Sequence, residues 1–324
     1  MTDLQNTDIK LTISASPHVR TNDDTRSIML DVIIALIPAL AVAMYIFGIQ
    51  ALIVTCVSVA ASVFFEWGYR KLLKKSKSIG DLSAIITGIL IAYCLPVSTP
   101  LWIVIVGDFF AIVIVKQLFG GIGHNFANPA IVARIVMLVS FSQSSMTEWV
   151  KPQSDLVASA TPLDMLYSGK TEGLPSVFDM IMGNRAGSIG ETCALAFVFG
   201  FVYLVYRRVI SWHTPVIFVG TVFVLSLVFT GDLTVSVYHL FSGGLLLGAV
   251  FMATDYSTSP PTPWGKVIFA LGCGIITVAI RLWGSNPEGV SYGILFMNIL
   301  TPYISKLTAH RIFGAERMKT GGAV

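Results

Sequence analysis

Charged residues are scarce in this chain, since Asp, Glu, Lys and Arg together make up 12% of its 324 residues. Soluble globular domains carry about 25%, so this composition excludes an ordinary soluble domain. Hydrophobic residues make up 54% of the chain, and they recur in runs that approach the ~20 residues a membrane-spanning helix needs. The composition therefore predicts an all-α integral membrane protein with little chain left for a separate soluble domain.

Paired cysteines are also lacking. Cys56, Cys94, Cys193 and Cys273 are far apart and form no C-x-x-C pair, which excludes a zinc site or a local disulfide framework of the usual spacing. Isolated cysteines in apolar segments are typical of small buried residues. A secretory signal is lacking as well, because the first 26 residues are polar and mixed in charge. We therefore expect the first membrane helix to stay in the mature protein.

The apolar segments fall into two groups of five. The first group covers residues 29–47, 52–69, 82–95, 101–115 and 129–141, and the second covers 192–206, 215–229, 238–252, 267–283 and 290–307. The predicted organisation is a cytoplasmic N-terminal segment (1–27), a first membrane repeat (28–141), an extracytoplasmic loop (142–190), a second membrane repeat (191–307) and a cytoplasmic tail (308–324). About ten transmembrane helices are therefore expected.

Lysine and arginine indicate the orientation. The densest basic loop, residues 70–77, lies between the second and third segments, and the positive-inside rule places it in the cytoplasm. By alternation, Lys116, Arg207, Arg208 and Lys266 also fall inside. Both termini are then cytoplasmic, and the long polar loop between the two groups lies outside.

Five segments in each half make the second half enter the membrane from the opposite side, which is the condition for an inverted repeat. The two halves also share an order of turn residues. Pro96, Ser98, Thr99, Pro100 and Trp102 follow the third segment, and Ser257, Thr258, Ser259, Pro260, Pro263 and Trp264 follow the eighth. The third and eighth segments are short for spanning, and such pairs indicate a site at the repeat interface.

One acidic residue interrupts an apolar segment near its middle. Asp108 has no charged neighbour from Leu101 to Val115, and an ionisable residue at this depth is costly and by default functional. We expect Asp108 to be an ion or proton site, or the partner of a cation such as Arg134. Glu66, Asp31 and Arg281 lie nearer segment ends, where side chains are expected to reach the interface.

The turn before the fifth segment is rich in glycine and asparagine, with Asn125 and Asn128 in it. It contains a G-x-G, but it lacks the last glycine of the G-x-G-x-x-G pattern and the preceding strand that a dinucleotide-binding site needs. Irregular backbone at membrane depth is tolerated where it lines a cavity. The turn can therefore be interpreted either as a break in a membrane helix or as a site of close helix packing. In the outer loop, Ser188 and Glu191 match a capping box at the start of the next helix.

A second helix start lies in the same loop. Thr161, Pro162 and Asp164 suit an N-cap, a first helical position and a first turn. Capping alone explains these residues. A helix N-terminus also stabilises a phosphate, so a phosphate ester on Thr161 is compatible with the same geometry.

The chain resembles the D subunit of the Rnf ion-translocating electron transport complex and its relative, the B subunit of the sodium-pumping quinone reductase. The resemblance covers nearly the whole chain. The similar motifs are Ser16-Pro17-His18, Gly120-Gly121-Ile122-Gly123 with Asn125, Asn128-Pro129-Ala130, Gly187-Ser188-Ile189-Gly190-Glu191-Thr192, Ala253-Thr254-Asp255 with Ser259-Pro260, and Pro287-Glu288-Gly289. The resemblance implies two inverted five-helix halves, like those of urea and ammonium channels.

In that family the outer loop carries FMN on a threonine through a phosphoester. The attachment motif is an Asp followed by Ser or Thr, Gly, Ala and the final Thr. The resemblance assigns it here to Asp155, Ser159, Ala160 and Thr161, with Thr161 as the attachment residue. Ser159 stands where Gly is common, and Ala158 where Ser or Thr is common.

The resemblance implies a membrane subunit of an ion-translocating ferredoxin:NAD+ oxidoreductase that relays electrons through this FMN and helps to couple electron flow to Na+ or H+ movement. Asp108, Asn125, Asn128 and Asp255 are the candidate ion-pathway residues. The implied cofactors are the covalent FMN and a second, non-covalent flavin as an option.

The resemblance also implies the surroundings of the protein. Its partners would be other Rnf subunits, among them an FMN-bearing extracytoplasmic subunit and iron–sulfur subunits, and an FMN transferase for maturation. We expect a prokaryotic cytoplasmic (inner) membrane and no nucleic acid. The sequence leaves open a subunit of a Na+-translocating quinone reductase, a non-redox channel or transporter on the same fold, and a structural subunit that seats redox partners.

Overall fold

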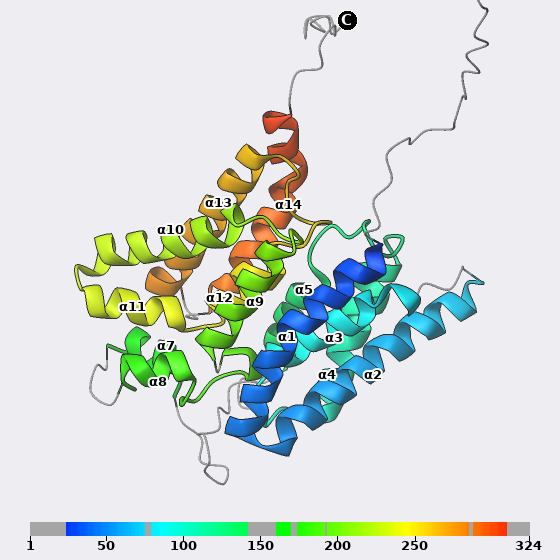
Figure 1. Cartoon of the computed structure of the whole chain (residues 1–324), viewed down its shortest axis with the longest axis horizontal. Coiled ribbons are helices and arrows are strands. Elements are labelled where there is room, and N and C mark those ends of the chain that lie inside the picture. The colour runs from blue at the N-terminus through cyan, green and yellow to red at the C-terminus, as the bar shows by residue number, and fades with distance from the viewer. Residues whose placement is uncertain are drawn as a thin grey trace, which may run out of the picture.

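The computed structural model describes residues 24–74, 79–141, 160–169, 174–191, 193–284 and 288–309. Within these ranges the protein is helical, without β-strands (Figure 1). The first group of elements is α1 (Thr25–Phe47), α2 (Ile49–Leu72), the 3-10 turn η1 (Ile79–Asp81), α3 (Ser83–Tyr93), α4 (Leu101–Phe109), the π-helix η2 (Phe110–Gln117) and α5 (Pro129–Ser140).

Short elements follow in the described part of the outer loop. They are α7 (Pro162–Tyr167), α8 (Val177–Met182) and the 3-10 turn η3 (Ile189–Glu191). The second group is α9 (Ala194–Tyr206), α10 (His213–Thr230), α11 (Leu233–Phe241), α12 (Leu245–Leu247), the π-helix η4 (Gly248–Met252), α13 (Pro263–Trp283) and α14 (Val290–Thr308).

Local signals begin several of these helices. Asn128 accepts the Ala130 N–H at 3.0 Å and precedes Pro129 at the start of α5. Thr262 accepts the Gly265 N–H at 3.1 Å and precedes Pro263 at the start of α13. In both cases a polar N-cap satisfies a free backbone donor, and proline occupies a position where its missing N–H costs nothing.

Among the described residues, four helices are long and apolar enough to cross a membrane: α1, α2, α10 and α13. The pair formed by α11 and the segment Leu245–Met252 passes the same test together, but it is bent by 60°. The apolar segment predicted over 238–252 is therefore interrupted by a bend rather than formed by one straight helix. Gly243 and Gly244 adopt φ values of +67° and +63° at the bend, a conformation that glycine adopts without steric cost.

Two helix pairs join the two groups. In the first group α2 packs against α3 and α4, and in the second α10 packs against α11 and α13. Between the groups, α1 packs on α9 and α5 packs on α14. Figure 1 shows the first group in blue and cyan on the right, the second from green to red on the left and top, and α7 with α8 at the lower left.

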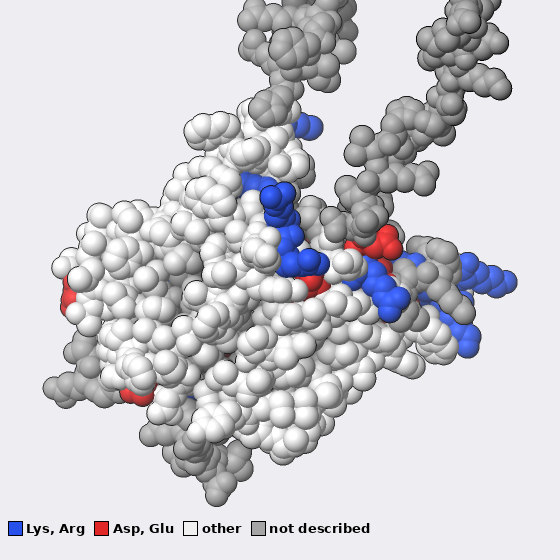
Figure 2. All heavy atoms as spheres, viewed as in Figure 1, with Lys and Arg blue, Asp and Glu red and all other residues white. Residues whose placement is uncertain are grey.

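Exposed cations gather at one end of the molecule, which we call the basic end. They lie near the start of α1 and the ends of α2, α9 and α14, as Arg26, Lys71, Lys74, Arg207, Arg208 and Lys306. In Figure 2 the visible blue side chains gather across the centre and right of the molecule, away from α7 and α8 at the lower left. In the part of the outer loop that is described, the one arginine, Arg185, is buried.

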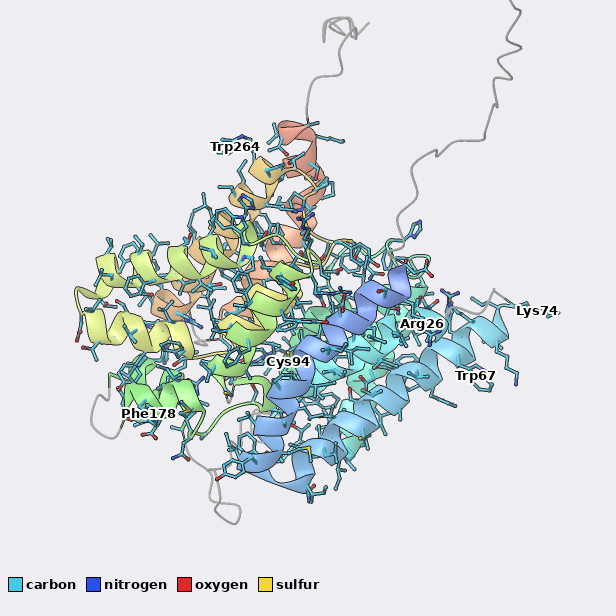
Figure 3. The ribbon with its side chains drawn as sticks, in the orientation of Figure 1. Arg26, Trp67, Lys74, Cys94, Phe178 and Trp264 are labelled. Atoms are coloured by element: carbon cyan, nitrogen blue, oxygen red, sulfur yellow. The ribbon has the colours of Figure 1, made fainter. Side chains whose placement is uncertain are left out.

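Exposed tryptophans mark both ends of the bundle. Trp67 lies near the end of α2 and Trp264 at the start of α13, both at the basic end (Figure 3). Trp102 begins α4 and Trp283 ends α13 at the opposite end. Tryptophan is enriched at membrane–water interfaces, so these positions fit a bundle whose helices cross a bilayer. Cys94, in contrast, lies in the interior (Figure 3).

Candidate functional site

Thr161 is the N-cap of α7, as the sequence predicts. Its Oγ1 accepts the Asp164 N–H at 3.1 Å and donates to the Asp164 carboxylate at 2.7 Å. The Asp164 carboxylate also accepts the Thr161 N–H at 3.3 Å. This reciprocal capping box satisfies donors that the start of a helix leaves free. Ala160 is exposed, whereas Thr161 is buried, with 6% of its surface accessible.

The start of α7 packs onto the break between α11 and α12. A side chain built on Gly243 would meet Leu163 Cδ2 at 2.6 Å and the Arg281 guanidinium at 2.9 Å. Because Gly243 has no side chain, Leu163 of α7 and Arg281 of α13 can both approach the bend. Arg281 donates to the carbonyls of His239 at 2.6 Å and Ser242 at 2.8 Å, so it binds carbonyls that the end of α11 leaves free.

Five buried or half-buried charged residues gather around the Gly243–Gly244 bend, on which α7 packs through Leu163, and we call them the arginine cluster. Its members are Arg134 on α5, Arg185 in the outer loop, Glu191 on η3, Arg281 on α13 and Glu288 before α14. Arg134 forms an ion pair with Glu288. Arg185 donates to the Glu191 carbonyl at 2.6 Å. When all five are ionised, three guanidiniums face two carboxylates, which leaves one positive charge.

Burial governs the protonation of the loop members of this cluster. Burial raises the pKa of the Glu191 carboxyl, and the Glu288 carboxylate raises it further, while Arg134 and Arg185 oppose the shift. Burial lowers the pKa of the Arg185 guanidinium to about 10. Arg185 therefore stays charged near neutral pH, and the positive charge of the cluster persists around the bend.

The candidate residues Asn125, Asn128 and Asp255 come together around one cavity of about 120 Å³, the basic-end cavity. Ser83 and Lys116 line it as well. Asn128 Nδ2 donates to the Met252 carbonyl at 3.3 Å, which ties α5 to the end of η4. Asp255 accepts hydrogen bonds from the hydroxyls of Ser257 and Thr258 within its own turn.

Asp108, on α4, lies apart from this cavity and faces α2. Its Oδ1 accepts the hydroxyls of Ser58 at 2.8 Å and Ser62 at 3.1 Å. Arg134 pairs with Glu288 instead, so the suggestion that Arg134 is the partner of Asp108 is wrong. Among the described residues, no group bonds to the buried Oδ2 of Asp108.

Four other sequence-based expectations are also corrected. Glu66, Asp31 and Arg281 are buried rather than extended to the interface, because each has a partner in the bundle. Those partners are Lys116 for Glu66, Arg207 for Asp31, and the carbonyls at the end of α11 for Arg281. Ser188 and Glu191 do not cap the next helix, since α9 begins at Ala194 with Cys193 as its N-cap.

The sequence reasoning also missed residues that line the interior. Lys116 and Glu66 form an ion pair, with Nζ and Oε2 2.7 Å apart. The four-residue spacing of the polar residues Ser58, Ser62 and Glu66 along α2 was the sequence signal that could have indicated this polar face. Arg185 had no local signal. For the flavin motif, Asp155, Ala158 and Ser159 lie outside the described residues.

Comparison with known proteins gives one family. The NQR2, RnfD, RnfE family matches residues 12–314. The D subunit of a Na(+)-translocating ferredoxin:NAD(+) oxidoreductase complex from Acetobacterium woodii is 47% identical, over 96% of this chain and 98% of its own. The D subunit of a proton-translocating ferredoxin:NAD(+) oxidoreductase complex from Clostridium ljungdahlii is 43% identical, over 94% and 97%. This chain therefore belongs to the NQR2, RnfD, RnfE family, on its RnfD branch.

Proposed function

We propose that this protein is the membrane D subunit of an ion-translocating ferredoxin:NAD+ oxidoreductase complex and carries FMN esterified to Thr161. The near full-length similarity to two such subunits supports the membership. The proposed setting is a prokaryotic cytoplasmic membrane, with other Rnf subunits, an FMN-bearing extracytoplasmic subunit and iron–sulfur subunits as partners. An FMN transferase would attach the flavin.

The described residues around Thr161 fit a phosphate ester. The hydroxyl stands at a helix start, where backbone N–H groups favour an anion. The arginine cluster contributes a positive charge around the bend on which α7 packs, and Leu163 and Arg281 meet at Gly243. When bound, FMN accepts and passes electrons, while the protein supplies its position and electrostatics.

Attachment also requires a local change at Asp164. An esterified Oγ1 has no hydrogen to donate, so the 2.7 Å bond to the Asp164 carboxylate would be lost. The phosphodiester would then face a carboxylate of the same charge, which favours rotation of Asp164 away from the ester. Because Thr161 is buried in the capping box, we propose that the transferase acts on an opened form of this segment.

The wider architecture of the proposal is ten membrane passes in two inverted halves, with both termini cytoplasmic. The gathering of exposed cations at the basic end supports the orientation. The matching contact patterns, α2 with α3 and α4 and α10 with α11 and α13, support the repeat. Electron flow would be coupled to movement of Na+ or H+, and the two relatives are named for different ions.

The attachment of FMN is tested by flavin fluorescence of the denatured protein in a gel, after co-expression with an FMN transferase. We expect a fluorescent band for the parent and none for Thr161→Ala. Thr262→Ala is the matched control, because Thr262 also caps a helix before proline but lies at the start of α13. We expect its band to persist. A dark parent, or a fluorescent Thr161→Ala band, contradicts the proposal.

A further inference from the structure

One face of α2 carries buried polar side chains through the apolar bundle. Ser58, Ser62 and Glu66 are spaced by four residues, and each has 0% of its surface accessible. Residues with this spacing lie above one another on one helix face. That face contacts α3, α4 and η2. Polar groups at such depth are costly unless they bond to one another or serve a function.

Asp108 lies at one end of this polar face. From α2 it meets only the hydroxyls of Ser58 and Ser62. On the α3 side, Ser58 Oγ lies 2.8 Å from the Gly88 carbonyl, and from α5 Met137 packs at the neighbouring Gly107. No described cation bonds to Asp108, which leaves its charge without an ionic partner.

The other end of the face opens on the basic-end cavity. Lys116 Nζ lies 2.7 Å from Glu66 Oε2 and 2.6 Å from Ser83 Oγ, and Arg70 Nε lies 3.7 Å from Glu66 Oε1. Ser83 Oγ in turn donates to Asp81 Oδ1 at 2.6 Å. Since Lys116 and Ser83 both line the basic-end cavity, this chain of hydrogen bonds connects Glu66 to the cavity that contains Asn125, Asn128 and Asp255.

The π-helix η2 aligns the two ends. Asp108 and Lys116 are eight residues apart, which in a regular α-helix would turn their side chains by about 80° relative to each other, at 3.6 residues per turn. The wider i→i+5 turn of residues 110–117 reduces this offset. Both side chains therefore face α2, where they meet Ser62 and Glu66. A π-helix inside an α-helix frequently marks a functional position.

The chemistry of this arrangement favours a proton over a metal cation. The separations of 2.8 and 3.1 Å between Asp108 Oδ1 and the serine hydroxyls are hydrogen-bond lengths, which leave no space for a cation between these oxygens. A buried carboxyl without an ionic partner is neutral when it holds a proton. The Oδ2 atom, which no described group contacts through a hydrogen bond, is the atom available to hold it.

We propose that Asp108 and the basic-end cavity are the two ends of one proton-transfer route, which runs along α2 through Ser62, Glu66 and Lys116. In the transfer, the O–H bond of the Asp108 carboxyl breaks as its proton passes to Ser62, and the Ser62 hydroxyl proton moves on to the Glu66 carboxylate, so Asp108 gains the negative charge that Glu66 loses. Lys116 then gives one ammonium proton to water in the basic-end cavity and takes the proton from Glu66, which restores the Glu66 carboxylate. One helical turn, about 6 Å, separates Ser62 from Glu66, and one hydrogen-bonded water molecule bridges such a gap. This inference deepens the ion coupling in the proposed function and rests on it.

Labelling of the purified complex tests the protonated carboxyl directly. Dicyclohexylcarbodiimide reacts with protonated carboxyl groups in apolar surroundings, and mass spectrometry locates the product. We expect label on Asp108 that decreases as pH rises and is unchanged by Na+. Asp108→Asn should abolish this label. If Na+ protects Asp108 from the reagent, or if no label appears at low pH, the proposal is overturned.

Transport by the complex in proteoliposomes tests the route. We expect Asp108→Asn and Glu66→Gln to lower the ratio of translocated ions to transferred electrons at least tenfold. Asp31→Asn is the matched control, because Asp31 is also a buried membrane acid but pairs with Arg207 and does not line the basic-end cavity. Unchanged ratios in both route variants overturn the proposal. Loss of flavin fluorescence in Thr161→Ala is a separate measurement, so failure of one claim is distinguishable from failure of the other.

Discussion

Thr161 shows at the scale of one residue how a structural and a proposed chemical role share an atom. Its Oγ1 both accepts and donates within the capping box of α7. Replacing an N-cap threonine by alanine costs about 1 kcal/mol, whereas serine keeps the hydroxyl. We therefore expect Thr161→Ala to lower the free energy of unfolding of the outer loop by about 1 kcal/mol, and Thr161→Ser to change it little.

Hydrogen exchange at the α7 amides, measured on protein produced without the transferase, checks this difference in the absence of flavin. Equal exchange in the alanine and serine variants would contradict the role of the hydroxyl as a cap.

Glu191 makes stability depend on pH. Its folded-state pKa is raised, mainly by burial, so its contribution to stability is fully present below the unfolded value of about 4.3. This contribution is lost as pH rises through the higher folded value. Glu191→Gln has no such titration. We expect the melting temperature of the parent to fall relative to that of Glu191→Gln across this window, and parallel curves would contradict the assignment.

At the scale of elements, Gly88 sets how closely α2 and α3 approach. A Cβ at this position would lie 2.8 Å from Val59 Cα and 3.0 Å from the Ser58 carbonyl. Backbone atoms at this distance cannot move independently, and overpacking of this kind costs about 1–3 kcal/mol. We expect Gly88→Ala to lower the melting temperature in detergent. Gly68→Ala is the matched control in α2, because a Cβ there meets nothing within 4 Å.

Elements with local start signals were predictable from the sequence. Thr161, Pro162 and Asp164 predict α7, and Asn128 with Pro129 predicts α5, because capping depends on residues that are neighbours in the chain. The bend at Gly243 and Gly244 was not predicted, because apolar residues continue on both sides of it. The reason for the bend, the approach of Leu163 and Arg281, comes from other parts of the chain.

The polar pairs of the interior could not be predicted for the same reason. Glu66 and Lys116 are 50 residues apart, and Arg134 and Glu288 are 154 apart. Single-sequence patterns indicate which residues are costly in a membrane, as they did for Asp108. They do not indicate the partner, since that depends on how the helices pack.

At the scale of the whole molecule, the Arg134–Glu288 pair links the first group of helices to the second. Removing one partner of a buried pair leaves an uncompensated charge and costs about 3–5 kcal/mol. We expect Glu288→Gln to lower the melting temperature of the purified protein strongly. Arg207→Gln removes a cation that is 47% exposed and leaves Asp31 with the Tyr203 hydroxyl at 2.8 Å, so it should cost at most about 1 kcal/mol. Similar losses for both variants would contradict the linking role.

The polar face of α2 also has an electrical consequence. Ser58 and Glu66 are eight residues apart, which is about 12 Å along the helix axis, or about 40% of a ~30 Å hydrocarbon core. A proton that moves over this distance crosses a similar share of the transmembrane voltage. At about 2.3 kcal/mol per charge for each 100 mV, the protonation equilibrium between Asp108 and Glu66 would shift by about 0.9 kcal/mol per 100 mV. The membrane potential that the complex builds would thus change the fraction of Asp108 that is protonated.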